Sequence, residues 1–264
     1  MHSELIKKNN IKLIGEGEKI LFFIHGYGCN QEMWRFITPS FIDNHKIVLI
    51  DLVGTGDSDI KAYDYLKYNT LDGYADDIIE ICDSFSLQNS VLIGHSVGAM
   101  IATLAANKRP ELFSKVIMIA PSPRYINETG YIGGFNQEDI NEMIEILNYN
   151  YLGWSNNIAS VITGENNSSE ITTELSTSFC KNNPEIATHF AHVAFLGDNR
   201  KDIKKLKHKT LIIQSKVDTI APIQVGEYLH KNIPFAELKI IDTIGHTPHL
   251  SYPEIIIDLI KQFI

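Results

Sequence analysis

The feature that most constrains the fold is a regular alternation of short apolar segments with segments of helical periodicity. Six apolar runs of strand length lead into Gly, Pro or polar residues, at 20–25, 46–51, 90–94, 115–120, 210–215 and 237–242. Helical patterns lie between or after them, at 70–85, 97–107, 222–230 and 253–264. This alternation predicts an α/β fold with a mostly parallel, doubly wound sheet and helices on both faces. Residues 11–14 are a candidate antiparallel edge strand.

One long stretch interrupts the alternation. Between residues 124 and 202 no segment resembles a buried strand, whereas four segments have apolar residues at helical spacing, at 137–148, 154–162, 169–180 and 184–196. We interpret 124–202 as a helical lid inserted after a core strand, above the carboxyl edge of the sheet, where such sheets bind ligands. Residues 1–123 and 203–264 then form the two parts of the core.

Composition narrows the class of partner. The 264 residues suit one large α/β domain, and a net charge of -9 disfavours nucleic acid and anionic membranes as partners. No apolar run is long enough to cross a bilayer, and the first ten residues lack the apolar core of a secretory signal. Three scattered cysteines suit a reducing cytosol, so we expect a cytoplasmic protein. No metal-ligand spacing or phosphate-binding loop occurs, so we expect neither a metal nor another cofactor.

The segment Gly94-His95-Ser96-Val97-Gly98 carries the main chemical signal. It follows an apolar strand and precedes a helix rich in small residues, which is the context of a nucleophile elbow. Gly94 and Gly98 leave room where chain segments crowd together at the sharp turn. Ser96 is therefore the candidate catalytic nucleophile, and a serine hydroxyl needs a base beside it.

Chain order supplies the partners of Ser96. In this type of site the acid follows the serine and the histidine comes last. His246, after the last strand, is the candidate base, and Asp218, after the strand before it, is the acid that orients the imidazole. His249 is a rival base that we interpret as structural.

An oxyanion hole needs two backbone N–H donors, each contributing about 3 kcal/mol to transition-state stabilisation. The candidates are Val97, which follows Ser96, and Tyr27, in the loop after the first parallel strand. In that loop we interpret His25 as structural and Cys29 as a small residue that lines the pocket. The predicted substrate pocket is apolar, and each of its candidate lining residues could also be a packing residue of the lid: Tyr27, Tyr125, Phe135, Trp154, Ile158, Phe190, Ala194 and Phe195.

Several motifs resemble those of one subfamily. They are 51–58 (DLVGTGDS), 68–77 (YNTLDGYADD), 94–98 (GHSVG), 109–113 (RPELF), 121–127 (PSPRYIN), 133–135 (GGF), 150–154 (NYLGW) and 245–251 (GHTPHLS). Together they resemble the RsbQ-like subfamily of α/β-hydrolases, which includes a bacterial regulator of the sigma-B energy-stress response and the plant strigolactone and karrikin receptors. The chain departs from that pattern at Tyr27, where Phe is usual, and at Thr247, where the plant proteins have Leu.

The resemblance implies an α/β-hydrolase fold with a V-shaped, four-helix lid over an apolar pocket, and a triad of Ser96, Asp218 and His246. It also implies slow hydrolysis of a small hydrophobic ester or lactone-like molecule, with stress signalling as the output. For the bacterial member, the implied partner is a phosphatase with a PAS sensor domain.

Other functions stay open at this point. A plain metabolic carboxylesterase would have the same triad, as would a cofactor-free haloperoxidase. A ligand-sensing interaction protein with little turnover would keep the same pocket. A dehalogenase or epoxide hydrolase needs an aspartate at the elbow, and Ser96 argues against both.

Overall fold

A seven-stranded sheet forms the centre of the molecule in the computed structural model, which describes residues 2–164 and 168–264. The strand order is β1 (Lys12–Ile14), β3 (His45–Leu49), β2 (Lys19–Ile24), β4 (Ser90–His95), β5 (Phe113–Ile119), β6 (Lys209–Val217) and β7 (Ala236–Ile244). β1 runs antiparallel to β3, and all the other neighbours are parallel. The predicted mostly parallel sheet and its antiparallel edge strand are confirmed.

Helices cover both faces of the sheet because alternate strand residues point to opposite sides. Phe22 and Leu92 belong to the core shared with α2 (Leu71–Ser84), α3 (Val97–Lys108) and α7 (Ile223–Asn232). Phe23 and Ile93 belong to a second core with α9 (Pro253–Phe263). The other helical segments outside the insertion are short. They are α1 (His2–Asn9), α8 (Pro248–Ser251) and the 3-10 turns Gln31–Trp34, Thr38–Ser40, Ile60–Ala62, Pro110–Leu112 and Ile203–Lys205.

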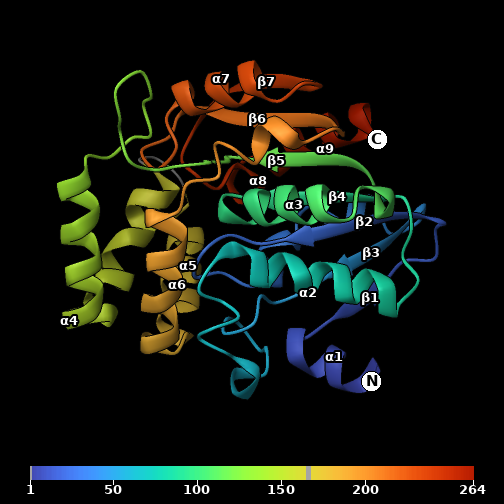
Figure 1. The fold of residues 1–264 in the computed structure, drawn as a ribbon, viewed down its shortest axis with the longest axis horizontal. Helices are drawn as coiled ribbons and strands as arrows, with labels where there is room; N and C mark the ends of the chain where they lie inside the picture. Colours follow the sequence, from blue (N-terminus) through green and yellow to red (C-terminus); the bar gives the residue numbers. More distant parts are fainter. Residues whose placement is uncertain (1, 165–167) are drawn as a thin grey trace.

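The insertion between β5 and β6 contains α4 (Gln137–Thr163), α5 (Ser169–Lys181) and α6 (Pro184–Leu196), which we call the lid. The three helices lie together at one end of the sheet (Figure 1). Two predicted helices are joined in α4, but the backbone of Asn150 leaves the helical region, with φ -150° and ψ 63°. The described residues of the insertion therefore form four α-helical segments. Residues 165–167 of the predicted lid lie outside the described residues.

The two ends of the insertion lie close together. The Asn199 amide donates to the Pro123 carbonyl at 2.8 Å, which joins the segment before α4 to the segment after α6. The strands on either side of the insertion, β5 and β6, are neighbours and pair in parallel from Lys115↔Lys209 to Ile119↔Ile213. The lid therefore extends from a continuous sheet without separating its strands.

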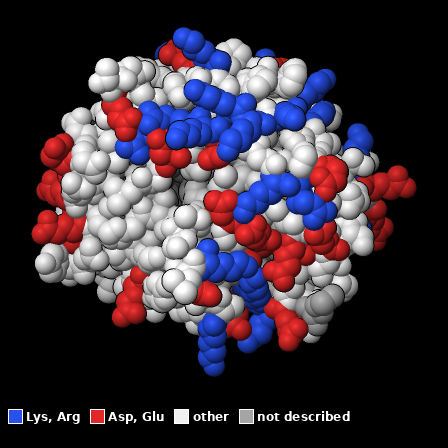
Figure 2. All heavy atoms as spheres, viewed as in Figure 1, with Lys and Arg blue, Asp and Glu red and all other residues white. Residues whose placement is uncertain are grey.

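The surface carries charges of both signs. Lys and Arg side chains interleave with Asp and Glu side chains on the face that shows α2 and α3 (Figure 2). Among the described helices, none has the length and hydropathy that a bilayer span requires.

Candidate active site

Ser96 lies at a sharp turn between β4 and α3. Its backbone has φ +54° and ψ -122°, a conformation that an L-residue adopts only under strain. Both flanking glycines are required by space: a Cβ on Gly94 would lie 2.5 Å from the Ala99 nitrogen, and one on Gly98 would lie 2.5 Å from the Ile24 oxygen. The turn therefore presents the Ser96 side chain at the carboxyl edge of the sheet, as the elbow motif predicts.

Three side chains from distant parts of the chain form a hydrogen-bonded series. The Ser96 Oγ lies 2.9 Å from His246 Nε2, and His246 Nδ1 lies 2.8 Å from Asp218 Oδ2. All three residues are buried. The structure thus brings together the serine, histidine and aspartate that the sequence predicts as a triad.

Backbone groups fix the orientation of Asp218. Its Oδ1 accepts hydrogen bonds from the amides of Ile220 (2.8 Å) and Ala221 (3.0 Å). Because Oδ1 is occupied by these donors, Oδ2 faces His246. Two amide donors also stabilise the ionised carboxylate, which is the form that can hold the imidazole.

His246 is held through its main chain as well. Its amide donates to the Ile162 carbonyl at the end of α4, at 2.7 Å. Its carbonyl accepts a hydrogen bond from His95 Nε2 at 2.8 Å, and burial lowers the pKa of His95 well below its usual range. A neutral His95 with its proton on Nε2 fits this contact. The base is therefore connected to the lid on one side and to the elbow on the other.

The loop after β2 passes beside Ser96. A Cβ on Gly26 would lie 3.3 Å from the Ser96 Cβ, so the chain here has no room for a side chain. Within the described chain, neither the Tyr27 amide nor the Val97 amide has a hydrogen-bond acceptor. Both predicted oxyanion donors are therefore free to bind a ligand oxygen.

Tyr125 contributes a contact that sequence reasoning did not predict. Its hydroxyl lies 3.2 Å from Ser96 Oγ, and burial raises the pKa of the phenol to about 12. The phenol is therefore protonated at neutral pH. If Ser96 donates its proton to His246, the Tyr125 hydroxyl donates to Ser96 Oγ.

A small apolar cavity opens over Ser96 and His246. Its volume is about 200 Å³, below the roughly 300–1,000 Å³ of pockets that take drug-sized ligands. Its apolar lining residues are Tyr27, Cys29, Phe135, Met143, Trp154, Ile158, Val161, Ile162, Phe179, Phe195 and Ile220. No Asp, Glu, Lys or Arg of the described residues lines it. A larger hollow of about 820 Å³ lies between α1 and α2, but it is lined by charged side chains and is remote from Ser96.

Known proteins share this architecture. A family model described as alpha/beta hydrolase fold matches residues 19–144. The karrikin insensitive 2 receptor CA of Petunia hybrida is 35% identical over 257 residues, which cover 97% of this chain and 95% of the receptor. The chain belongs to the α/β-hydrolase family.

Two further α/β-hydrolases are similar over nearly the whole chain. A strigolactone esterase of Arabidopsis thaliana is 35% identical over 250 residues, 94% of this chain and 93% of the esterase. The solved structure of a hydrolase from Oleispira antarctica has a TM-score of 0.97 and 38% identity, and the match covers 99% of this chain and 96% of that one.

Within this hydrolase, most predicted pocket residues border the cavity. Tyr27, Phe135, Trp154, Ile158 and Phe195 line it, as does Cys29. Five apolar lining residues were not predicted: Met143, Val161, Ile162, Phe179 and Ile220. The first four belong to predicted lid helices.

Three predicted lining residues, Tyr125, Phe190 and Ala194, do not border the cavity. Tyr125 contacts Ser96 through its hydroxyl and packs in a separate buried cluster with Ile126 and Ile140. Phe190 and Ala194 are buried on the face of α6 that packs against the hydrophobic core. The Phe190 ring lies 4.7 Å from that of Tyr74 in α2. Helical periodicity identified the buried face of α6 but could not separate its core contacts from its cavity contacts.

The other residues considered for chemistry are structural. His25 Nε2 accepts from the Leu52 amide at 3.0 Å, so this side chain joins the loops after β2 and β3. The His249 ring is fully buried against Trp34, at 4.7 Å between centroids. Burial raises the pKa of the Cys29 thiol, which disfavours the thiolate. Of the histidines His25, His246 and His249, His246 is the one whose ring is hydrogen-bonded to Ser96. Among the described residues, no group of His, Cys, Asp and Glu is placed to hold a metal ion.

Proposed function

We propose that this α/β-hydrolase is a serine hydrolase that cleaves a small hydrophobic ester or lactone-like molecule. One observation carries the proposal: the Ser96 hydroxyl, 2.9 Å from His246 Nε2, faces an apolar cavity of about 200 Å³. A cavity of this size and lining favours a small neutral substrate, because a charged group buried there would lack a partner.

In the acylation step, His246 Nε2 takes the Ser96 proton as Oγ attacks the substrate carbonyl. The Tyr27 and Val97 amides would hold the negative oxygen of the tetrahedral intermediate. Asp218 stabilises the imidazolium without taking its proton. The C–O bond of the ester then breaks, and the imidazolium gives its proton to the leaving alcohol.

In the deacylation step, His246 takes a proton from water, and the hydroxide attacks the acyl-serine carbonyl. Collapse of the second intermediate releases the acid, and the proton on His246 returns to Ser96. For a lactone, the alcohol and the acid remain parts of one product. The apolar lid residues would exclude bulk water while the acyl-enzyme exists.

Replacement of the serine tests the proposal. We expect Ser96→Ala to lower kcat on p-nitrophenyl butyrate by roughly 10⁴-fold or more, because the covalent route is lost. Ser90→Ala is the matched control, since Ser90 is a buried serine at the opposite end of β4, and it should keep wild-type turnover. Undiminished turnover in Ser96→Ala would contradict the proposal.

The second candidate function is signalling, in which turnover is slow and the lid reports the bound ligand. Two observations favour it: the similar Petunia protein is named a receptor, and the lid carbonyl of Ile162 binds the His246 amide at 2.7 Å. The motifs that resemble the RsbQ-like subfamily suggest a cytoplasmic stress regulator whose partner is a phosphatase with a PAS domain.

Binding and kinetics separate the two candidates. A regulator should bind a PAS-domain phosphatase in a pull-down, and Ser96→Ala should change how ligand affects that binding. A fast kcat on one metabolite, without binding to the phosphatase, would instead identify a plain metabolic carboxylesterase.

A further inference from the structure

The loop of residues 26–29, which we call the oxyanion loop, is held from the side of the lid. The Tyr27 hydroxyl donates to the Ala187 carbonyl of α6 at 2.9 Å. The Gly28 carbonyl accepts from Asn182 Nδ2 at 2.9 Å and from Ser178 Oγ at 3.1 Å. In the part of the chain that the structure describes, the hydrogen bonds of Tyr27 and Gly28 all go to the lid.

Packing joins the same two parts. Gly28 has φ +72°, and a Cβ there would lie 1.9 Å from Phe179 Cε1 of α5. The Tyr27 ring lies within 6.0 Å of four aromatic rings of the lid, measured between centroids: Trp154, Phe179, Phe190 and Phe195. The lid helices α5 and α6 therefore fix the course of the backbone at Tyr27 and Gly28.

The core gives this segment much less support. The Gly26 carbonyl accepts from His25 Nδ1 at 2.8 Å and from the Cys29 amide at 3.4 Å. Both contacts are local, and the second, at the long end of the hydrogen-bond range, closes the turn that has Tyr27 and Gly28 as its central residues. Two glycines in four residues leave the backbone few steric limits of its own.

We infer that Asn182, Ser178 and the Tyr27 hydroxyl are positioning residues that aim the Tyr27 amide at the substrate oxygen, so that the lid completes the oxyanion hole. The inference rests on the proposed serine-hydrolase function. An oxyanion donor must lie about 2.7–3.1 Å from the negative oxygen of the transition state. Loss of the lid contacts therefore acts on the transition state more than on bound substrate, and lowers kcat with little effect on KM.

The test variant is Ser178→Ala/Asn182→Ala, which removes both donors to the Gly28 carbonyl. With p-nitrophenyl butyrate we expect kcat to fall about tenfold while KM stays within about twofold. Butylboronic acid is the second probe, because its adduct with serine places a tetrahedral oxygen where the oxyanion forms. Its Kd should rise by about the same factor as kcat falls.

Tyr27→Phe is a milder variant that removes one hydroxyl and keeps the ring, so it serves if the double variant unfolds. It should change kcat and boronate affinity in the same direction and by a smaller factor. Glu174→Gln is the matched control: Glu174 lies one turn before Ser178 in α5 and pairs with Arg35 of the core, away from the cavity. It should leave kcat, KM and boronate affinity within about twofold of wild type.

The outcomes distinguish failure of this inference from failure of the proposed serine-hydrolase function. Unchanged kcat in Tyr27→Phe and in a folded double variant, or a rise in KM alone, would overturn the inference while the hydrolase function stands. A wild-type protein that neither cleaves esters nor reacts at Ser96 with a fluorophosphonate would overturn the proposed function and the inference with it.

Discussion

The Tyr125 hydroxyl changes the expected behaviour of the nucleophile. It lies 3.2 Å from Ser96 Oγ, so it occupies a lone pair of the resting serine. As Oγ becomes an ester oxygen it is a weaker acceptor, and the hydrogen bond loses strength. A contact that is stronger in the ground state than in the transition state slows acylation.

We therefore expect Tyr125→Phe to raise the rate at which a fluorophosphonate labels Ser96 by up to about tenfold, since one neutral hydrogen bond contributes about 0.5–1.5 kcal/mol. Tyr131→Phe is the control, because the Tyr131 hydroxyl donates to the Arg124 carbonyl outside the cavity. A labelling rate that falls in Tyr125→Phe would mean that the phenol assists the attack.

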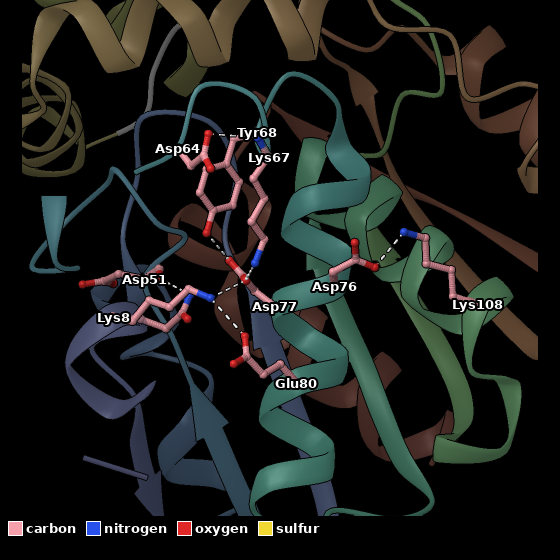
Figure 3. A network of polar contacts seen from close by, with 10 residues as sticks. Lys8, Asp51, Asp64, Lys67, Tyr68, Asp76, Asp77, Glu80 and Lys108 are labelled. Atoms are coloured by element: carbon pink, nitrogen blue, oxygen red, sulfur yellow. Dashed lines mark hydrogen bonds and ion pairs between the residues drawn. The ribbon is translucent and has the colours of Figure 1, made fainter. Parts of the chain in front are cut away.

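At the scale of the element, α2 carries two neighbouring aspartates with different surroundings (Figure 3). The Asp77 side chain is 2% exposed and accepts from Lys8, Lys67 and the Tyr68 hydroxyl. The Asp76 side chain is 54% exposed and pairs with Lys108. The first aspartate joins α1, α2 and the segment before α2, whereas the second pairs α2 with α3.

We expect Asp77→Ala to lower the free energy of unfolding by about 3 kcal/mol, because it removes the acceptor of the buried Tyr68 hydroxyl and of the Lys67 ammonium group and leaves Lys8 paired with Glu80. Asp76→Ala should cost less than about 1 kcal/mol, as for an exposed ion pair. Urea unfolding of the two variants measures the difference. Equal losses of unfolding free energy in the two variants would show that the buried contacts of Asp77 do not stabilise the fold more than the exposed pair of Asp76.

The sequence predicted elements whose pattern is local. The strands of the sheet were found because each is a short apolar run, and α3 because it follows the elbow. Helix α1 was not predicted, since its eight residues are mostly polar and it is held by distant partners such as Asp59 and Asp77. The break at Asn150 lies between two predicted helices, but its form as a kink within the single helix α4 was not predicted, because it depends on the Asn150 side chain, which accepts from the Gly153 amide at 3.0 Å.

The same limit applies to the site. The positions of Ser96, Asp218 and His246 followed from motif and chain order, and their hydrogen bonds link residues up to 150 positions apart. The contacts of the oxyanion loop with Asn182 and Ala187 could not be predicted, because they depend on how the lid helices pack. Local pattern identifies chemical groups, whereas tertiary packing decides which of them support each other.

At the scale of the whole molecule, two buried histidines make stability depend on pH. Burial lowers the pKa of His249 to about 3, with the charges of His246 and Arg35 adding to the effect, and burial lowers the pKa of His95 well below its usual range. In the unfolded chain both rings titrate near 6.5, so below that pH the unfolded state binds more protons. Stability therefore rises with pH in this window and is lost as pH falls below about 6.5.

At pH 5.5, protonation of each of these two histidines in the unfolded state should lower the free energy of unfolding by about 1.4 kcal/mol. For His249→Gln, the loss of unfolding free energy between pH 7.5 and 5.5 should shrink by about 1.3 kcal/mol relative to wild type. His230→Gln is the control, because His230 is exposed on α7 and solvent reaches its ring in both states. An unaltered pH dependence in His249→Gln would show that His249 is protonated in the folded protein.

The meeting of the two ends of the lid has a consequence for how this hydrolase can diversify. The Asn199 amide donates to the Pro123 carbonyl, so the segment between them leaves the core and returns to it at one place. A different helical segment could be exchanged there without rethreading the scaffold that carries Ser96, Asp218 and His246. The oxyanion loop limits this freedom, because Gly28 and Tyr27 take their hydrogen bonds from the lid. With a different segment the proposed nucleophile would stay in place, but the contacts that position the Tyr27 amide would have to form again. Substrate range and catalytic rate would therefore evolve together.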